Sequence, residues 1–197
     1  MSRIKGAAIN ARLDFIRERH GQDTLDRIVD SLDDMSQVIL TGTLLPSIWY
    51  PYQVLQGLDE AIVNELGVEA DEVFEVAGEQ VGRQHARSLF RVFHREADPE
   101  RVLRLAVSIF SGCACGHGRL VLRKGQEPGQ ERLSVVGASA GRAHCLTLGA
   151  YFRTVLAYCT ENEVEVREVR CRNEEGDSCE FEFAWQPVAY RRAAVGE

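Results

Sequence analysis

Residues 141–185 read GRAHCLTLGAYFRTVLAYCTENEVEVREVRCRNEEGDSCEFEFAW and combine one helical pattern with two strand patterns. Segment 142–160 repeats apolar residues at helical spacing, so we expect a helix there. Segments 164–172 and 178–185 largely alternate between apolar and polar residues, as half-buried strands do. We therefore expect a helix whose apolar stripe packs on a β-hairpin.

The predicted hairpin brings two cysteines together. A three-residue loop at Glu174–Gly176, with Gly176 in the left-handed conformation, suits the sequence between the strands. This loop would place Cys171 directly opposite Cys179, and the Cβ atoms of such partners lie about 5 Å apart. Two thiolates at that distance can share a metal ion or oxidise to a disulfide. The other interpretation is a reduced, half-buried pair without a further role.

Glu168 can join these cysteines only if its strand is irregular. Glu168 and Cys171 are three residues apart and would point to opposite faces of a regular strand. The apolar pattern also changes phase, because Val164 and Val166 have one parity and Val169 has the other. One extra residue near Glu168, a β-bulge, accounts for both observations. We predict this bulge, which would turn Glu168, Val169 and Cys171 to the same side, and a regular ladder would argue against Glu168 as a ligand.

Cys145 lies near the start of the predicted helix, on the stripe that packs against the hairpin. A helix N-terminus favours a thiolate over a thiol. Three thiolates and one carboxylate suit tetrahedral Zn²⁺ in a closed structural site. The predicted ligands are Cys145, Glu168, Cys171 and Cys179. His144 is an alternative ligand, and Cys159, at the other end of the stripe, is either a core residue or a ligand.

The same four residues resemble a known family. Cys145, the E-x-x-C motif that ends at Cys171, and Cys179 after seven further residues are similar to the 4-vinyl-reductase domain. The similarity is to the zinc-binding form in aromatic-sensing domains of enhancer-binding activators, and it covers 141–185. It implies zinc ligation and a sensory role. The wider fold superfamily includes TRAPP core subunits and haem-NO-binding domains, so the fold alone implies no single activity.

Length, charge and hydropathy exclude several classes of protein. The chain has 197 residues and a formal net charge of −7, which argues against a nucleic-acid-binding surface. It contains no apolar run of about 18 residues that would span a membrane, and its start lacks a signal-peptide core. We expect a cytoplasmic protein, in which six cysteines favour metal binding or free thiols over disulfides.

The first third of the chain is predicted to be a helical extension, residues 1–66. Helices are expected at 9–20, 23–32 and 51–66, each with a start or stop signal. The apolar segment 44–52, which lies between these helices, contains Trp49 and Tyr50. It either packs across the core or binds a partner.

Residues 67–187 are predicted to form the 4-vinyl-reductase-like domain, and 188–197 a tail. We expect helices at 70–96 and 98–110, then strands at 118–124 and 131–137. With the later hairpin these strands make a four-stranded, mostly antiparallel sheet covered by helices, an α/β (α+β) fold.

Glycine and cysteine spacings in this region suggest further contacts. Gly78 and Gly82 lie one turn apart on the 70–96 helix and cost roughly 1 kcal/mol each against alanine. Another helix should therefore approach closely there, in the core or across a dimer. The segment 111–118 contains Cys113, Cys115 and His117 and is either a tight loop of small residues or a second metal or redox site. His85 is either a core histidine or a ligand contact.

The sequence contains no nucleophile–base motif, phosphate loop or dinucleotide fingerprint. A closed four-ligand zinc site also has no position for a water nucleophile, so we expect no enzyme activity. We expect a zinc-containing sensory domain that binds a small apolar molecule between the long helices and the sheet, and acts through a partner protein or a homodimer. The alternative is a TRAPP-like interaction scaffold without a small ligand. A closed apolar cavity would favour the first, and a filled core with exposed apolar patches the second.

Overall fold

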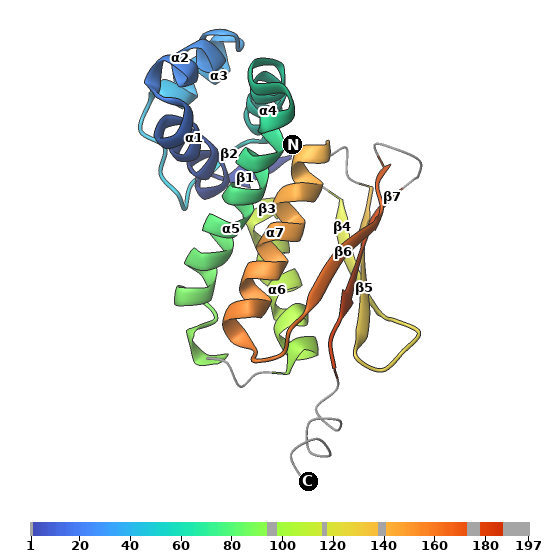
Figure 1. The fold of residues 1–197 in the computed structure, drawn as a ribbon. Helices are drawn as coiled ribbons and strands as arrows, with labels where there is room; N and C mark the ends of the chain where they lie inside the picture. Colours follow the sequence, from blue (N-terminus) through green and yellow to red (C-terminus); the bar gives the residue numbers. More distant parts are fainter. Residues whose placement is uncertain (1, 94–97, 116–117, 138–140, 173–177, 187–197) are drawn as a thin grey trace.

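The computed structural model describes residues 2–93, 98–115, 118–137, 141–172 and 178–186 (Figure 1). An N-terminal group of helices lies at one end, and the remaining helices cover one face of a sheet. The N-terminal lobe comprises β1 (Arg3–Lys5), α1 (Gly6–His20), α2 (Gln22–Asp30), α3 (Asp34–Thr41), β2 (Trp49–Pro51) and α4 (Tyr52–Leu66). The helices that follow are η1 (Gly67–Glu69), α5 (Ala70–Ser88), η2 (Arg91–Phe93), α6 (Pro99–Cys113) and α7 (Arg142–Cys159). The later strands are β3 (Ala114–Cys115), β4 (Arg119–Lys124), β5 (Gln130–Val136), β6 (Glu165–Arg170) and β7 (Ser178–Ala184).

The main sheet has the order β4-β5-β7-β6, and every neighbouring pair is antiparallel. Alternate residues of its central strands, Leu133 and Val135 on β5 and Phe181 and Phe183 on β7, are buried under the helices. Polar residues occupy the other face, where Glu182 pairs with arginines of both flanking strands. The predicted α+β class and four-stranded sheet are confirmed.

Two hydrophobic clusters fill the interior. The first lies between α6, α7 and the sheet and includes Phe152, Phe181 and Phe183. The second lies inside the N-terminal lobe and reaches Phe74 on α5 and Ala143 at the start of α7. Helices α5 and α7 therefore pack against both clusters.

The contact between α5 and α7 depends on two glycines. A Cβ atom on Gly78 would lie 2.2 Å from the Thr147 carbonyl oxygen, and one on Gly82 would lie 3.0 Å from Thr154 Cβ. A side chain at Gly78 would overlap the backbone of α7, and one at Gly82 would press against the Thr154 side chain. The predicted close approach of another helix is confirmed, and that helix is α7.

Helix α5 ends earlier than the predicted 70–96. The His85 carbonyl oxygen accepts the usual helical hydrogen bond from the Leu89 N–H, four residues later. It also accepts one from the Phe90 N–H, five residues later. The chain leaves the helix there because Phe90 turns into the core, where it is fully buried, while Leu89 faces solvent.

A small sheet of order β2-β1-β3 was not predicted. It pairs Ile4 with Tyr50 on one side and with Ala114 on the other. Segment 111–118 is consequently not one loop, because α6 continues to Cys113 and β3 follows at once. Trp49 is half-buried in β2, with the Lys5 ammonium 4.1 Å from its ring centre. None of the described helices is long and apolar enough to cross a membrane.

Gly78→Ala should separate α5 from α7. The new methyl group overlaps backbone, which cannot move aside as a side chain can, so we expect a loss of about 1–3 kcal/mol in the free energy of unfolding. Gly57→Ala on α4 is the matched control, because its Cβ would meet only Leu32 Cδ2 at 3.6 Å. That change should stabilise by about 0.5–1 kcal/mol in urea unfolding. Equal effects of the two variants would contradict the close packing.

Candidate metal centre

The structure brings all four predicted ligands together. The ligand atoms of Cys145, Glu168, Cys171 and Cys179 lie within 4.8 Å of one another. Cys145 Sγ and Cys179 Sγ are 3.1 Å apart, and their residues are only 1% and 5% exposed. These atoms come from the start of α7, from β6 and the residue that follows it, and from β7.

The predicted β-bulge is confirmed and explains the position of Glu168. Glu168 pairs with Phe181, the next ladder pair is Arg170 with Glu180, and the register shifts between them. Opposed residues in an antiparallel pair share a face, so Glu168 points to the same side as the buried Phe181. Val169, which was predicted to turn to this side as well, is instead the extra residue and is 39% exposed. Without the bulge, Glu168 would not share a face with the cysteines.

Cys171 lies just beyond the ladder rather than within it. The last pair of β6 and β7 is Arg170 with Glu180, so the predicted direct pairing of Cys171 with Cys179 is not formed. The Arg172 N–H instead donates to Cys179 Sγ at 3.4 Å. This hydrogen bond holds the backbone that follows β6 against the cluster. The predicted loop at Glu174–Gly176 lies outside the described residues.

The cluster concentrates groups that carry negative charge when ionised. Burial raises the pKa of the Cys145 thiol, and its hydrogen bond with Cys179 and the charge of Glu168 raise it further. Glu168 Oε1 is buried without a hydrogen-bond partner. A buried carboxylate oxygen without a partner costs free energy, and a cation at the centre would satisfy it. The arrangement is therefore suited to hold a metal ion.

His144 and Cys159, the alternative ligands, are not part of the cluster. His144 directs its ring toward Phe110, with 6.0 Å between ring centres. Cys159 is fully buried in the helix–sheet core, and burial raises the pKa of its thiol to about 11. Cys159 is therefore a core residue. The side chain of Cys115 and the whole of His117 lie outside the described residues, so a second site with Cys113 stays a prediction.

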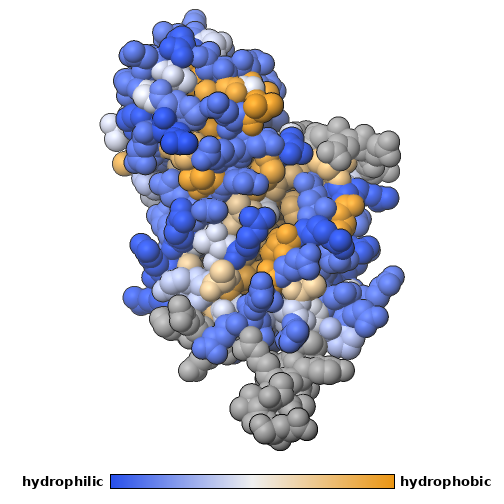
Figure 2. All heavy atoms as spheres, in the orientation of Figure 1, coloured by the Kyte–Doolittle hydropathy of each residue, from blue (hydrophilic) through white to orange (hydrophobic). Residues whose placement is uncertain are grey.

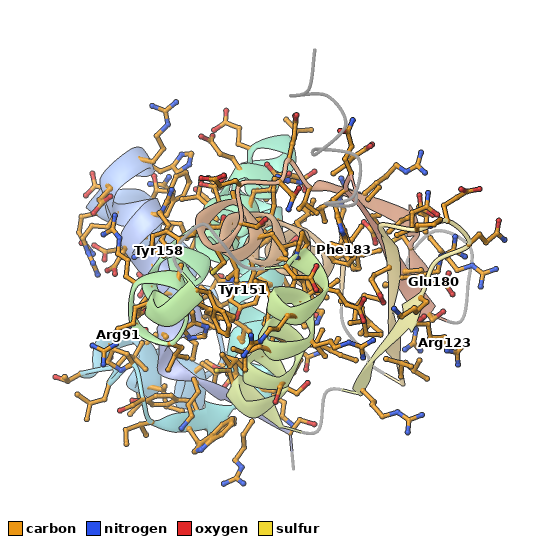
Figure 3. All side chains as sticks on the ribbon, turned by 90° about the horizontal axis from the view of Figure 1, so that it is seen from below. Arg91, Arg123, Tyr151, Tyr158, Glu180 and Phe183 are labelled. Carbon is orange, nitrogen blue, oxygen red and sulfur yellow. The ribbon has the colours of Figure 1, made fainter. Side chains whose placement is uncertain are left out.

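His85 and Tyr151 form a polar pair within the helix layer. His85 Nδ1 lies 3.2 Å from Tyr151 Oη, and the two rings meet edge to face. Tyr151 points from α7 into the space between α5 and α6, while Phe183 lies between the helices and the sheet (Figure 3). Each polar group has the other as a partner, which supports the interpretation of His85 as a core histidine.

Three pockets lined by described residues lie at the surface. One of about 430 Å³ lies among α4, α5 and the start of α7, with Val63, Phe74 and Ala143 in its lining. Another of about 650 Å³ lies at the end of the sheet beside Trp185. A third, of about 330 Å³, lies between α2 and α4. Aromatic side chains of the core lie between the long helices and the sheet, where the small ligand was expected.

Comparison with known proteins identifies the fold. No protein-family description matches the chain, and no curated protein does. Among solved structures, an H-NOX protein of T. tengcongensis is 14% identical, with a TM-score of 0.66 over 94% of this chain and 100% of that chain. The Fe(II) unliganded H-NOX protein of K. algicida is 15% identical, with a TM-score of 0.65 over 95% and 99%. The S. oneidensis H-NOX protein in its Fe(II)NO state is 13% identical, with a TM-score of 0.62 over 93% and 100%.

These likenesses show that the chain has the H-NOX fold. They agree with the wider superfamily expected from the sequence, whereas the 4-vinyl-reductase resemblance itself is not shown. The expectation of structural zinc as the cofactor is wrong by this comparison. The neighbours are H-NOX proteins, which bind haem, and two of their structures are described by the state of an Fe(II) centre. The comparison thus points to haem rather than structural zinc.

Haem can be tested against the residues of this chain. Haem iron takes an axial ligand such as His, Cys, Met or Tyr, which must face room for the macrocycle. His85 is bonded to Tyr151 beside the tight α5–α7 contact, and no His, Cys, Met or Tyr lines the pockets described above. His94 and His117 lie outside the described residues. The described residues therefore do not fit haem, and we assign it no role in this chain.

His85 should make stability depend on pH. Burial lowers its pKa from the ordinary 6.5, so the unfolded chain binds a proton more readily than the folded chain. The free energy of unfolding should therefore decrease as pH falls below about 6.5 and be fully restored above it. His85→Gln keeps an acceptor for the Tyr151 hydroxyl and should flatten this part of the profile in urea unfolding. An unchanged slope would show that other groups cause the pH dependence.

Proposed function

We propose that this chain is a non-catalytic sensory domain built around a thiolate metal centre and that it signals through a partner protein. The fold supports a sensory role, because it is shared with H-NOX proteins, one of which is described with NO at its Fe(II). The cluster of three thiols and one carboxylate is the observation on which the metal centre rests.

The ligand set favours a soft metal ion, because thiolates select thiophilic metals. The donors come from α7, from β6 and the residue after it, and from β7, so a bound ion would link the start of α7 to the hairpin. Metal binding would also neutralise the buried charges and contribute to folding stability.

A small ligand would bind in the pocket of about 430 Å³ between α4, α5 and α7. This volume is within the range of small-molecule sites, and Phe74 and Val63 provide apolar surface. Ala143 also lines the pocket and lies two residues before Cys145, so a ligand there would contact the same turn of α7 as the metal centre. This proposal replaces the expected position beneath the sheet.

The metal centre is tested by elemental analysis of protein purified without chelator. We expect one thiophilic metal ion per chain, retained by Cys159→Ala and lost by Cys171→Ala. Cys171→Ala should lower the free energy of unfolding by roughly 4 kcal/mol or more, and Cys159→Ala by about 1 kcal/mol. Each variant removes one buried cysteine, so the difference between their stabilities isolates the contribution of metal binding. Metal-free wild-type protein, or iron with the visible absorbance of haem, would contradict the thiolate centre.

The ligand pocket is tested by a thermal-shift screen of small apolar compounds. A ligand at a hundred times its Kd should stabilise wild type by about 2.7 kcal/mol. Val63→Arg should abolish this shift by filling the pocket with a charged side chain. Val38→Arg is the control, because Val38 is exposed on α3 outside the pocket. Stabilisation that survives Val63→Arg would place the ligand elsewhere.

An interaction scaffold is the second candidate, and exposed apolar side chains favour it. Val38 is 73% exposed, and Met35, Leu45 and Ile48 of the same lobe are also exposed. Figure 2 shows hydrophobic residues gathered on the N-terminal lobe and along the region of α7, with hydrophilic residues around them. This candidate would be favoured if no compound in the screen stabilises the protein and if the protein self-associates in a way that Val38→Arg abolishes.

A further inference from the structure

Arg12 is a fully buried cation that joins four helices. It lies on α1, is 2% exposed, and forms an ion pair with Asp59 on α4. Its Nη2 donates to Thr147 Oγ1 on α7 at 3.1 Å, and its guanidinium lies 5.5 Å from the ring centre of Phe74 on α5. The Thr147 hydroxyl in turn donates to the Phe74 carbonyl oxygen at 3.1 Å. We call these residues the Arg12 junction.

Placing this junction inside the protein is costly. Burial raises the pKa of Asp59, and the charge and hydrogen bond of Arg12 act against that shift. A buried ion pair often contributes little net stability compared with apolar residues of the same size. Stability alone therefore gives little reason for a charged pair here, whereas its fixed hydrogen-bond geometry can define how α7 sits against the N-terminal lobe.

The junction and the metal cluster hold the same turn of α7 from opposite sides. Thr147 lies two residues after Cys145, and side chains two positions apart on a helix point in different directions. Cys145 faces Cys179 on the sheet, whereas Thr147 faces Arg12 and Phe74. A movement of this turn of α7 that breaks the Thr147 bonds would therefore also displace Cys145 Sγ.

We propose that Arg12 is a positioning residue for the metal cluster, acting through Thr147 to set the place of Cys145 against the hairpin. The inference rests on the proposed metal centre. Because coupling between two equilibria is reciprocal, metal binding should in return stabilise the docking of α1 and α4 on α7. The N-terminal lobe thereby responds to the state of a cluster that it does not ligate.

Thr147→Val tests this link with little risk to folding. Valine has nearly the shape of threonine, so the change removes the two hydroxyl bonds and leaves the Arg12–Asp59 pair in place. Thr154→Val is the matched control, because Thr154 lies on the same helix and packs on α5 at Gly82. Chelator-treated proteins are titrated with Co²⁺, whose thiolate charge-transfer absorbance reports coordination. Hydrogen exchange is then measured with and without the metal.

Thr147→Val should weaken Co²⁺ binding on the order of tenfold, the size of effect seen when a residue that orients a metal ligand is removed. Thr154→Val should bind as wild type does. In wild type, Co²⁺ should slow exchange in α1 and α4 as well as at α7 and the hairpin, and in Thr147→Val the slowing in α1 and α4 should disappear.

Two results would overturn the positioning role while leaving the metal centre intact. One is equal Co²⁺ affinity of the two threonine variants, and the other is wild-type protection confined to α7 and the hairpin. Failure of wild type to bind Co²⁺ at all would reject the metal centre and this inference together. The titration therefore distinguishes failure of the positioning role from failure of the metal centre itself.

Discussion

The close contact between α5 and α7 is the constraint on which the rest of the structure depends. Gly78 lies against the backbone of α7 and Gly82 against the Thr154 side chain, and this close packing fixes α7 between the N-terminal lobe and the sheet. From that position α7 can present Cys145 to the hairpin on one side and Thr147 to the lobe on the other. A wider separation would shift the turn of α7 that contains both residues, so the metal cluster and the buried Arg12 junction depend on the same packing.

The residues that form the cluster were predictable because their signals are local. The phase change along 164–171 predicted the bulge, and the bulge brought Glu168 to the face of the cysteines. The two glycines likewise predicted a helix contact, since they are costly wherever no close approach requires them. In each case a short stretch of sequence contained the physical reason for the structure.

Other features were missed because their causes lie far apart in the chain. Arg12 is paired with Asp59, 47 residues away, and with Thr147, 135 residues away, and no local pattern marks either partner. The small sheet pairs strands of two or three residues, too short for alternation to be visible. Helix α5 ends where Phe90 enters the core, a tertiary preference that overrides the helical pattern of the segment.

One fold can hold different groups, so the likeness to H-NOX proteins does not decide which group the cluster of this chain binds.

The bulge in β6 has a second consequence besides the position of Glu168. β6 is an edge strand of the main sheet. Edge strands are templates for unwanted pairing, and an extra residue interrupts the regular row of backbone groups that such pairing needs. The inserted residue that turns Glu168 inward therefore also makes β6 a poorer template for pairing with another strand.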